Sequence, residues 1–181
     1  MTATNDTPDP IDALAADEFP VDQRHIYLNH AAISPWPERA RRAMRAFVDG
    51  ITDDGSLHFP DWQETDVQLR ARFRDLLNAA GTESIALVPN TSVGLSLVAA
   101  GLDWRAGDNV VITDSEFPSN RMPWEALQER GVEVREARAD AQCEDNILAR
   151  VDERTRVVSV SSVQFGTGLA LDLEHLGREL T

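Results

Sequence analysis

The chain has 181 residues, of which 17 are basic and 31 acidic, so its formal net charge at pH 7 is −14. This acidity argues against a nucleic-acid-binding protein, because such proteins need a basic surface. All 17 basic residues are arginine, and chemistry that depends on a lysine amine therefore cannot be carried out by these residues alone.

The N-terminal residues and the single cysteine indicate the cellular compartment of the protein. The N-terminus carries acids where a secretion signal needs basic residues and an apolar run. No apolar stretch approaches the roughly 20 residues of a membrane-spanning helix. Cys143 is the only cysteine, which excludes an internal disulfide and a multi-cysteine zinc site and fits a reducing compartment. We therefore expect a cytoplasmic protein without a membrane partner.

The first part of the chain is predicted to be an arm followed by two helices. Residues 1–24 are rich in Asp, Thr and Pro, lack periodicity and are predicted to be extended. Residues 36–51 and 61–80 place apolar side chains at helical spacing and predict two amphipathic helices.

From residue 84 onward, short β-like runs alternate with helical stretches. The predicted strands are 84–89, 108–113, 132–137 and 156–163, and the predicted helices are 92–102, 119–131, 145–153 and one that begins near Asp172. This order predicts an α/β fold, with a parallel or mostly parallel sheet covered by helices in a three-layer arrangement. The last helix should lead into a further strand, so the sheet is expected to be incomplete within these residues.

Ligands of open α/β sheets bind at the carboxyl ends of the strands, so the residues that follow each predicted strand are the first candidates for a site. Thr91 and Ser92 begin the helix after the first strand, where hydroxyls and free backbone N–H groups can bind an anion without a basic residue. The same residue types are common helix caps, so a plain cap is the alternative.

Two further junctions carry candidate ligand groups. Phe117 follows an acid at the end of the second strand and could stack on a planar ligand, or else fill the core. Gln164 offers an amide after the strand 156–163, and the glycines at 166 and 168 allow close backbone approach, although a simple turn explains them equally well.

Other chemistries have little support in the sequence. The four histidines lack metal-ligand spacing, so no metal site is predicted; they are His25, His30, His58 and His175. Acids flank Cys143 and would raise the pKa of its thiol, which disfavours a nucleophile. The glycine-rich fingerprints of nucleotide-binding loops are absent.

Taken together, the junctions resemble the class V aminotransferase family of pyridoxal-phosphate (PLP) enzymes, which includes cysteine desulfurases, kynureninases and isopenicillin epimerase-like proteins. The resemblance is carried in order by YLNHAAISPWP (27–37), IALVPNTSVGLSLVAAGLDWRAGDNVVI (85–112), SEFPSNRMPW (115–124) and VVSVSSVQFGTGLALDLEHLG (157–177). It implies a fold type I large domain with the cofactor pyridoxal 5'-phosphate above the sheet.

The resemblance also assigns roles to individual positions. Thr91 and Ser92 match the residues that bind the cofactor phosphate, and Phe117 matches the aromatic residue that stacks on the pyridine ring, where many desulfurases carry histidine. Gln164 falls near the residue that approaches the ring hydroxyl. Asn29 and His30 match a segment on the substrate side.

In this family the lysine that joins PLP covalently, and the aspartate that pairs with the ring nitrogen, come later than the matched region. Residues 25–181 are therefore expected to be the N-terminal part of the large domain of an enzyme acting on an amino acid, with no catalytic residue of their own. The complete enzyme is expected to be a homodimer. The alternatives are a non-catalytic truncated module that binds PLP weakly or pairs with another chain, and a nonfunctional fragment.

Overall fold

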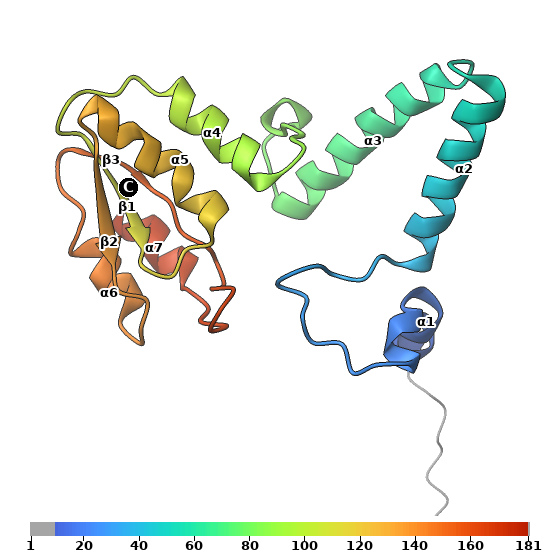
Figure 1. Cartoon of the computed structure of the whole chain (residues 1–181), viewed down its shortest axis with the longest axis horizontal. Coiled ribbons are helices and arrows are strands. Elements are labelled where there is room, and N and C mark those ends of the chain that lie inside the picture. Colours follow the sequence, from blue (N-terminus) through green and yellow to red (C-terminus); the bar gives the residue numbers. More distant parts are fainter. Residues whose placement is uncertain (1–9, 181) are drawn as a thin grey trace, which may run out of the picture. The chain divides into compact units, whose positions relative to one another are not determined.

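The computed structural model describes residues 10–180, so residues 1–9 of the expected arm lie outside the described part. The chain divides into two compact units, residues 1–86 and 87–181, which we describe separately (Figure 1). Among the described residues, the regular elements of the first unit are all helical, and the second unit contains the sheet.

In the described part of the first unit, helical elements follow one another along the chain. They are α1 (Pro10–Glu18), the 3-10 turn η1 (Pro20–Gln23), α2 (Glu38–Asp54), α3 (Phe59–Leu77) and the 3-10 turn η2 (Thr82–Ser84). The two amphipathic helices predicted from the sequence are thus present, each with its ends shifted by a few residues.

The prediction of an extended arm is wrong for residues 10–23, which are largely helical. The segment PIDALAADE is rich in alanine and leucine, which have high helix propensity, and begins with a proline that is favourable at the first helical position. Its end is held by Glu18, whose carboxylate pairs with Arg39 at 3.0 Å and accepts the backbone N–H of the same residue.

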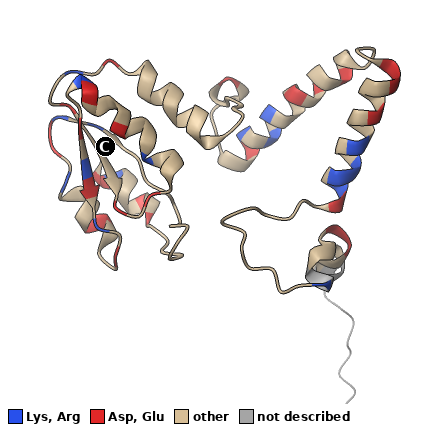
Figure 2. Ribbon diagram, viewed as in Figure 1, with Lys and Arg blue, Asp and Glu red and all other residues tan. Residues whose placement is uncertain are grey.

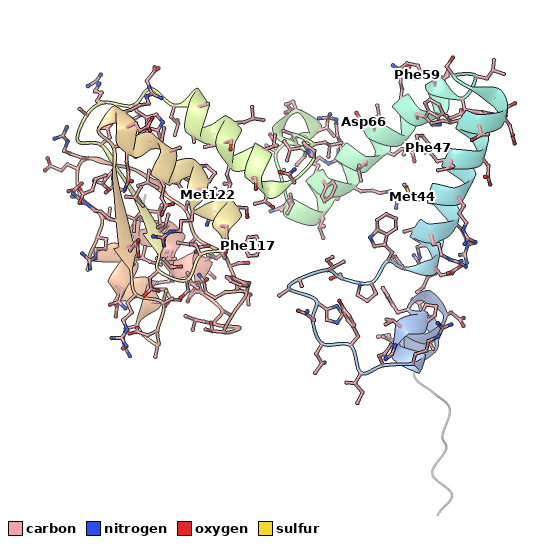
Figure 3. All side chains as sticks on the ribbon, in the orientation of Figure 1. Met44, Phe47, Phe59, Asp66, Phe117 and Met122 are labelled. Carbon is pink, nitrogen blue, oxygen red and sulfur yellow. The ribbon has the colours of Figure 1, made fainter. Side chains whose placement is uncertain are left out.

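Helices α2 and α3 keep their apolar side chains largely exposed. No residue of either helix is buried, and the exposed side chains include Met44, Phe47 and Phe59 (Figure 3). A hollow of about 710 Å³ lies between the two helices and is lined in part by Phe47, Trp62 and Leu69. Such faces normally pack against another element, so α2 and α3 lack a covering layer within the described part of this unit.

Charge is distributed unevenly along these two helices (Figure 2). Arginines gather in the first half of α2 and the second half of α3, whereas acids gather near the turn that joins the helices. No helix within residues 10–180 combines the length and apolar character needed to cross a membrane.

The described part of the second unit is a parallel three-stranded sheet covered by helices. Its elements are α4 (Thr91–Gly101), β1 (Asn109–Thr113), η3 (Pro118–Asn120), α5 (Met122–Glu125), η4 (Ala126–Arg130), β2 (Glu133–Ala137), α6 (Cys143–Leu148), β3 (Thr155–Val158) and α7 (Leu173–Glu179). The strand order is β2-β1-β3 and both pairings are parallel. The predicted three-layer α/β fold is confirmed.

The central strand β1 is buried on both faces, because its side chains alternate between two apolar clusters. Val110 and Ile112 pack with residues of α4, α5 and η4, among them Trp124. Val111 packs on the opposite side with residues of α6 and α7, including Ile147. Burial on both faces explains why the middle of β1, Val110 to Ile112, is apolar at consecutive positions.

Two predicted strands differ from the structure. Residues 84–89 were expected to form a strand, but Ile85 is extended without pairing to any strand among the described residues. The strand predicted over 156–163 is β3, which ends at Val158. After Ser159 donates its backbone N–H to Val111, the N–H of Ser161 turns to the carboxylate of Glu116 instead of a strand partner.

The helix predicted over 145–153 also has different limits. It is α6, which begins two residues earlier, at Cys143, and ends at Leu148. Its end tightens into 3-10 type bonds, in which the N–H groups of Arg150 and Val151 donate to carbonyls three residues back. The early start places Cys143 in the core, beside Ile147.

Candidate functional site

The candidate site residues of the second unit come from segments at the carboxyl edge of the sheet. The loop after β1 carries Phe117, and the loop after β3 carries Gln164. Helix α4 precedes β1, packs on the sheet and contacts η3, the turn that follows the carboxyl end of β1. Its first residues are Thr91 and Ser92, whose place at this same edge is a prediction.

The start of α4 combines a cap with free polar groups. Asn90 is the residue that caps the helix, because its Oδ1 accepts the backbone N–H of Val93 at 2.9 Å. The side chains of Thr91 and Ser92 are exposed, and neither hydroxyl bonds to another residue of the described chain. The cap is thus formed by Asn90, and the anion site at Thr91 and Ser92 stays a prediction.

Below this edge lies a buried polar network centred on Glu116. One carboxylate oxygen, Oε1, accepts hydrogen bonds from Thr113 Oγ1 (2.9 Å), the Ser161 backbone N–H (3.0 Å) and Gln164 Nε2 (3.1 Å). The other, Oε2, accepts from Asn120 Nδ2 (2.9 Å) and Ser161 Oγ (2.6 Å). The network joins β1 and the loop that follows it to the loop after β3.

The donors of this network keep Glu116 ionised. Burial raises the pKa of its carboxyl, but the hydrogen bonds from Ser161, Asn120 and Gln164 outweigh that effect, so the pKa is lowered. The Glu116 side chain is therefore a buried anion at neutral pH.

Phe117 is the residue next to this buried carboxylate. It packs edge-to-face on Phe165, with ring centroids 5.1 Å apart and planes at 86°. Phe117 is 48% exposed and Phe165 is 51% exposed, so the reading of Phe117 as a core residue is wrong. Figure 3 shows the Phe117 side chain projecting from the loop after β1. An exposed aromatic ring at this edge can stack on a planar ligand.

Gln164 is almost fully buried, with 1% of its surface exposed. Its Nε2 donates to both Glu116 and Thr113, whereas its Oε1 has no hydrogen-bond partner among the described residues. A buried acceptor without a partner costs free energy, and a ligand that donates a hydrogen bond would remove that cost.

The remaining candidates come from other segments of the chain. Asn29 and His30 belong to the first unit, where the ring of His30 packs edge-to-face on Tyr27 at 5.3 Å, so their place on the substrate side stays a prediction. Cys143 is buried; burial raises its thiol pKa, and nearby acids such as Glu144 add to the effect, which disfavours a nucleophile.

Sequence reasoning missed the buried polar network. Glu116 was considered only as an acid before an aromatic residue, and Asn120 and Ser161 were not singled out. The available signal was the clustering of polar residues after two neighbouring parallel strands, since carboxyl ends of parallel strands lie at one edge.

A parallel, helix-covered sheet with polar loops at its carboxyl edge is typical of α/β proteins that bind a ligand at that edge, and comparison with known proteins identifies the family. The family model for class V aminotransferases matches residues 26–181. The chain therefore belongs to the class V aminotransferase family, as the sequence resemblance implied. Enzymes of this family depend on PLP.

Individual relatives agree with this family. A probable cysteine desulfurase of Methanothermobacter thermautotrophicus is 33% identical over 168 residues, which are 89% of this chain and 42% of that protein. A cysteine desulfurase structure from Escherichia coli has a TM-score of 0.77 at 21% identity, covering 96% of this chain and 46% of that one. A variant of C-DES with glycine linked to its PLP has a TM-score of 0.79 at 24% identity, with the same coverages.

These structural likenesses show the fold. The chain spans less than half the length of the curated relatives that it matches.

Proposed function

We propose that residues 25–181 form the N-terminal part of the large domain of a PLP-dependent enzyme that acts on an amino acid. The observation that carries the proposal is an exposed Phe117 and a buried, incompletely bonded Gln164 in the loops at the carboxyl edge of the sheet. We propose that the start of α4, with the free hydroxyls of Thr91 and Ser92, lies at the same edge. Family membership supports PLP as the ligand of this edge.

The residues present fit the parts of PLP. The hydroxyls of Thr91 and Ser92, with the first N–H groups of α4, suit a phosphate, since a helix N-terminus favours negative charge. The ring of Phe117 suits the flat face of the pyridine, and the free Oε1 of Gln164 suits a hydroxyl on that ring. When bound, PLP would supply an electron sink for reactions of amino acids.

This chain supplies binding and orientation but not every group that the chemistry needs. Its 181 residues contain no lysine, so the amine that joins PLP covalently must come from sequence beyond them or from another chain. We propose that the complete enzyme contains that lysine and the aspartate for the ring nitrogen, and that it is a cytoplasmic homodimer. The non-catalytic module with weak PLP affinity is the alternative.

Phe117 bears on the type of reaction. A phenyl ring can stack on the cofactor but cannot carry a proton, unlike the histidine that many desulfurases have at this position. We therefore propose that the reaction, although related to that of the desulfurase relatives, does not use proton transfer at this position.

The phosphate site can be tested in the full-length protein by replacing its hydroxyls. Thr91→Ala and Ser92→Ala should each weaken PLP binding by about 1.5–3 kcal/mol, or about 10- to 150-fold in Kd, because each removes a hydrogen bond to a charged group. The measurement is a PLP titration followed by absorbance.

Ser96→Ala is the matched control, because Ser96 is exposed on the same helix one turn further along. Its PLP affinity should equal that of the wild type. If both Thr91→Ala and Ser92→Ala keep wild-type affinity, the phosphate does not bind at the start of α4.

A further inference from the structure

Two carboxylates are buried at opposite edges of the sheet, and their surroundings differ. Asp108 lies before β1, 3.7 Å from the guanidinium of Arg156. Glu116 lies after β1, is 6% exposed and has no basic side chain within 4.0 Å among the described residues. It is balanced only by neutral donors.

Such an arrangement is costly for stability. A buried charge loses its hydration, and hydrogen bonds from neutral groups repay that loss only when they are numerous and well aligned. The two oxygens of Glu116 accept five hydrogen bonds from four residues, Thr113, Asn120, Ser161 and Gln164. Because an apolar residue could fill the same space without this cost, the carboxylate calls for an explanation beyond packing.

The geometry of the loops after β1 and β3 explains why the buried carboxylate is present. Glu116 bonds to Gln164 inside the protein, and the next residues along each loop, Phe117 and Phe165, pack on each other at the surface. The loops after β1 and β3 are thus joined by two successive side-chain contacts, one polar and buried, the other aromatic and exposed. The buried hydrogen bond between Glu116 and Gln164 therefore fixes how the rings of Phe117 and Phe165 lie against each other.

Glu116 also fixes the orientation of the Gln164 amide. With Nε2 toward Glu116 the pair forms a hydrogen bond of 3.1 Å; a rotated amide would bring its oxygen against the carboxylate oxygen instead. The carboxylate therefore forces Oε1 to be the end of the amide that is left without a partner in the described chain.

We propose that Glu116 is a positioning residue for the cofactor: it clamps the loops after β1 and β3 so that Phe117 and the oxygen of Gln164 meet the same PLP ring. This inference rests on the proposed function. Glu116 does not itself touch the cofactor, and its effect passes through the two residues that it holds.

The test is Glu116→Gln in the full-length protein, a change that keeps the shape but replaces one acceptor oxygen with a donor. The new NH₂ group takes the place of one carboxylate oxygen. In the place of Oε1 it faces the N–H donors of Ser161 and Gln164, and in the place of Oε2 it faces the N–H donor of Asn120, so a donor meets a donor in either case. We expect PLP to bind at least about tenfold more weakly and the visible circular dichroism of the bound cofactor to change, since the ring is no longer held in one orientation.

Two controls separate positioning from a general loss of structure. Glu129→Gln removes an exposed carboxylate that has no hydrogen-bond or ion-pair partner in the described chain, and it should leave both readouts unchanged. Inorganic phosphate, measured by its competition with PLP, should bind Glu116→Gln with wild-type affinity, because the start of α4 is untouched. Equal weakening of phosphate and PLP would overturn the proposal.

If Glu116→Gln does not fold, Ser161→Ala takes its place, because it removes one hydroxyl donor and leaves the carboxylate and the backbone bond. It should weaken PLP binding several-fold and alter the dichroism. If the wild-type protein binds PLP and the variants keep its affinity and dichroism, Glu116 does not position the cofactor, and the proposed function still stands. A wild-type protein that does not bind PLP overturns both.

Discussion

Phe117 is the residue at which stacking on PLP can be probed most simply. Its ring is half exposed and rests on Phe165, so truncation costs little core packing. Phe117→Ala in the full-length protein should weaken PLP binding by about 0.5–1.5 kcal/mol, which is less than the loss of a phosphate contact, and should shift the absorbance band of the cofactor. An unaltered spectrum would show that the ring does not contact PLP.

At the scale of residues, the chain order predicts which loops carry the candidate residues, but it does not predict the burial of Glu116. Thr91, Ser92 and Phe117 follow predicted strands, and the chain order alone predicts their place at one edge of the sheet. Glu116 was missed because a glutamate in a loop is almost always exposed. Its burial depends on Ser161 and Gln164, which are 45 and 48 residues away in sequence.

At the scale of elements, the junction of α2 and α3 is held by a histidine between two acids. His58 Nε2 lies 3.0 Å from Asp54 Oδ2, and Nδ1 lies 3.4 Å from Asp61 Oδ2. Hydrogen bonds to Asp54 and Asp61 raise the pKa of His58 above its ordinary value of 6.5. The stabilisation is therefore fully present below pH 6.5 and is lost as the pH rises through the raised pKa.

Amide hydrogen exchange in residues 54–61 of the full-length protein, corrected for the intrinsic effect of pH, should consequently be slower at pH 6 than at pH 8. His58→Gln should abolish this difference, and His175→Gln, on α7, should preserve it. A pH dependence that survives in His58→Gln would contradict the role assigned to the two acids.

The sequence pattern predicts an element well when nearby residues suffice to form it. It predicts less well when the element needs a hydrogen-bonded strand from elsewhere in the chain. The run 108–113 carries three consecutive apolar residues, Val110 to Ile112, and β1 is central and buried on both faces. The run 84–89 reads equally well as a strand, yet a strand requires a hydrogen-bonded neighbour, and the described residues supply none. The helix over residues 10–18 was missed because Asp and Pro near the N-terminus masked the helix propensity of its alanines.

At the scale of the whole molecule, the uncovered faces of α2 and α3 are the main feature that the described residues do not explain. Both helices are amphipathic, but side chains such as Met44, Phe47 and Leu76 are between 41% and 76% exposed. Under the proposed function, sequence beyond these 181 residues or a second chain covers them.

Residues 1–181 produced alone should accordingly bind a hydrophobic dye such as anilinonaphthalene sulfonate and self-associate, whereas the full-length protein should do neither. Dye fluorescence and size-exclusion chromatography are the measurements. If the 181-residue chain is monodisperse and does not increase the fluorescence of the dye, the result would favour the self-contained, non-catalytic module.

The most direct test of PLP binding is the cofactor content of the protein purified from its native cells. We expect about one PLP released by alkali per chain, because the site that we propose has one place for a phosphate, at the start of α4, and one aromatic ring for stacking, Phe117. A native protein that contains no PLP, and takes up none after incubation with the cofactor, would contradict the function proposed for this chain.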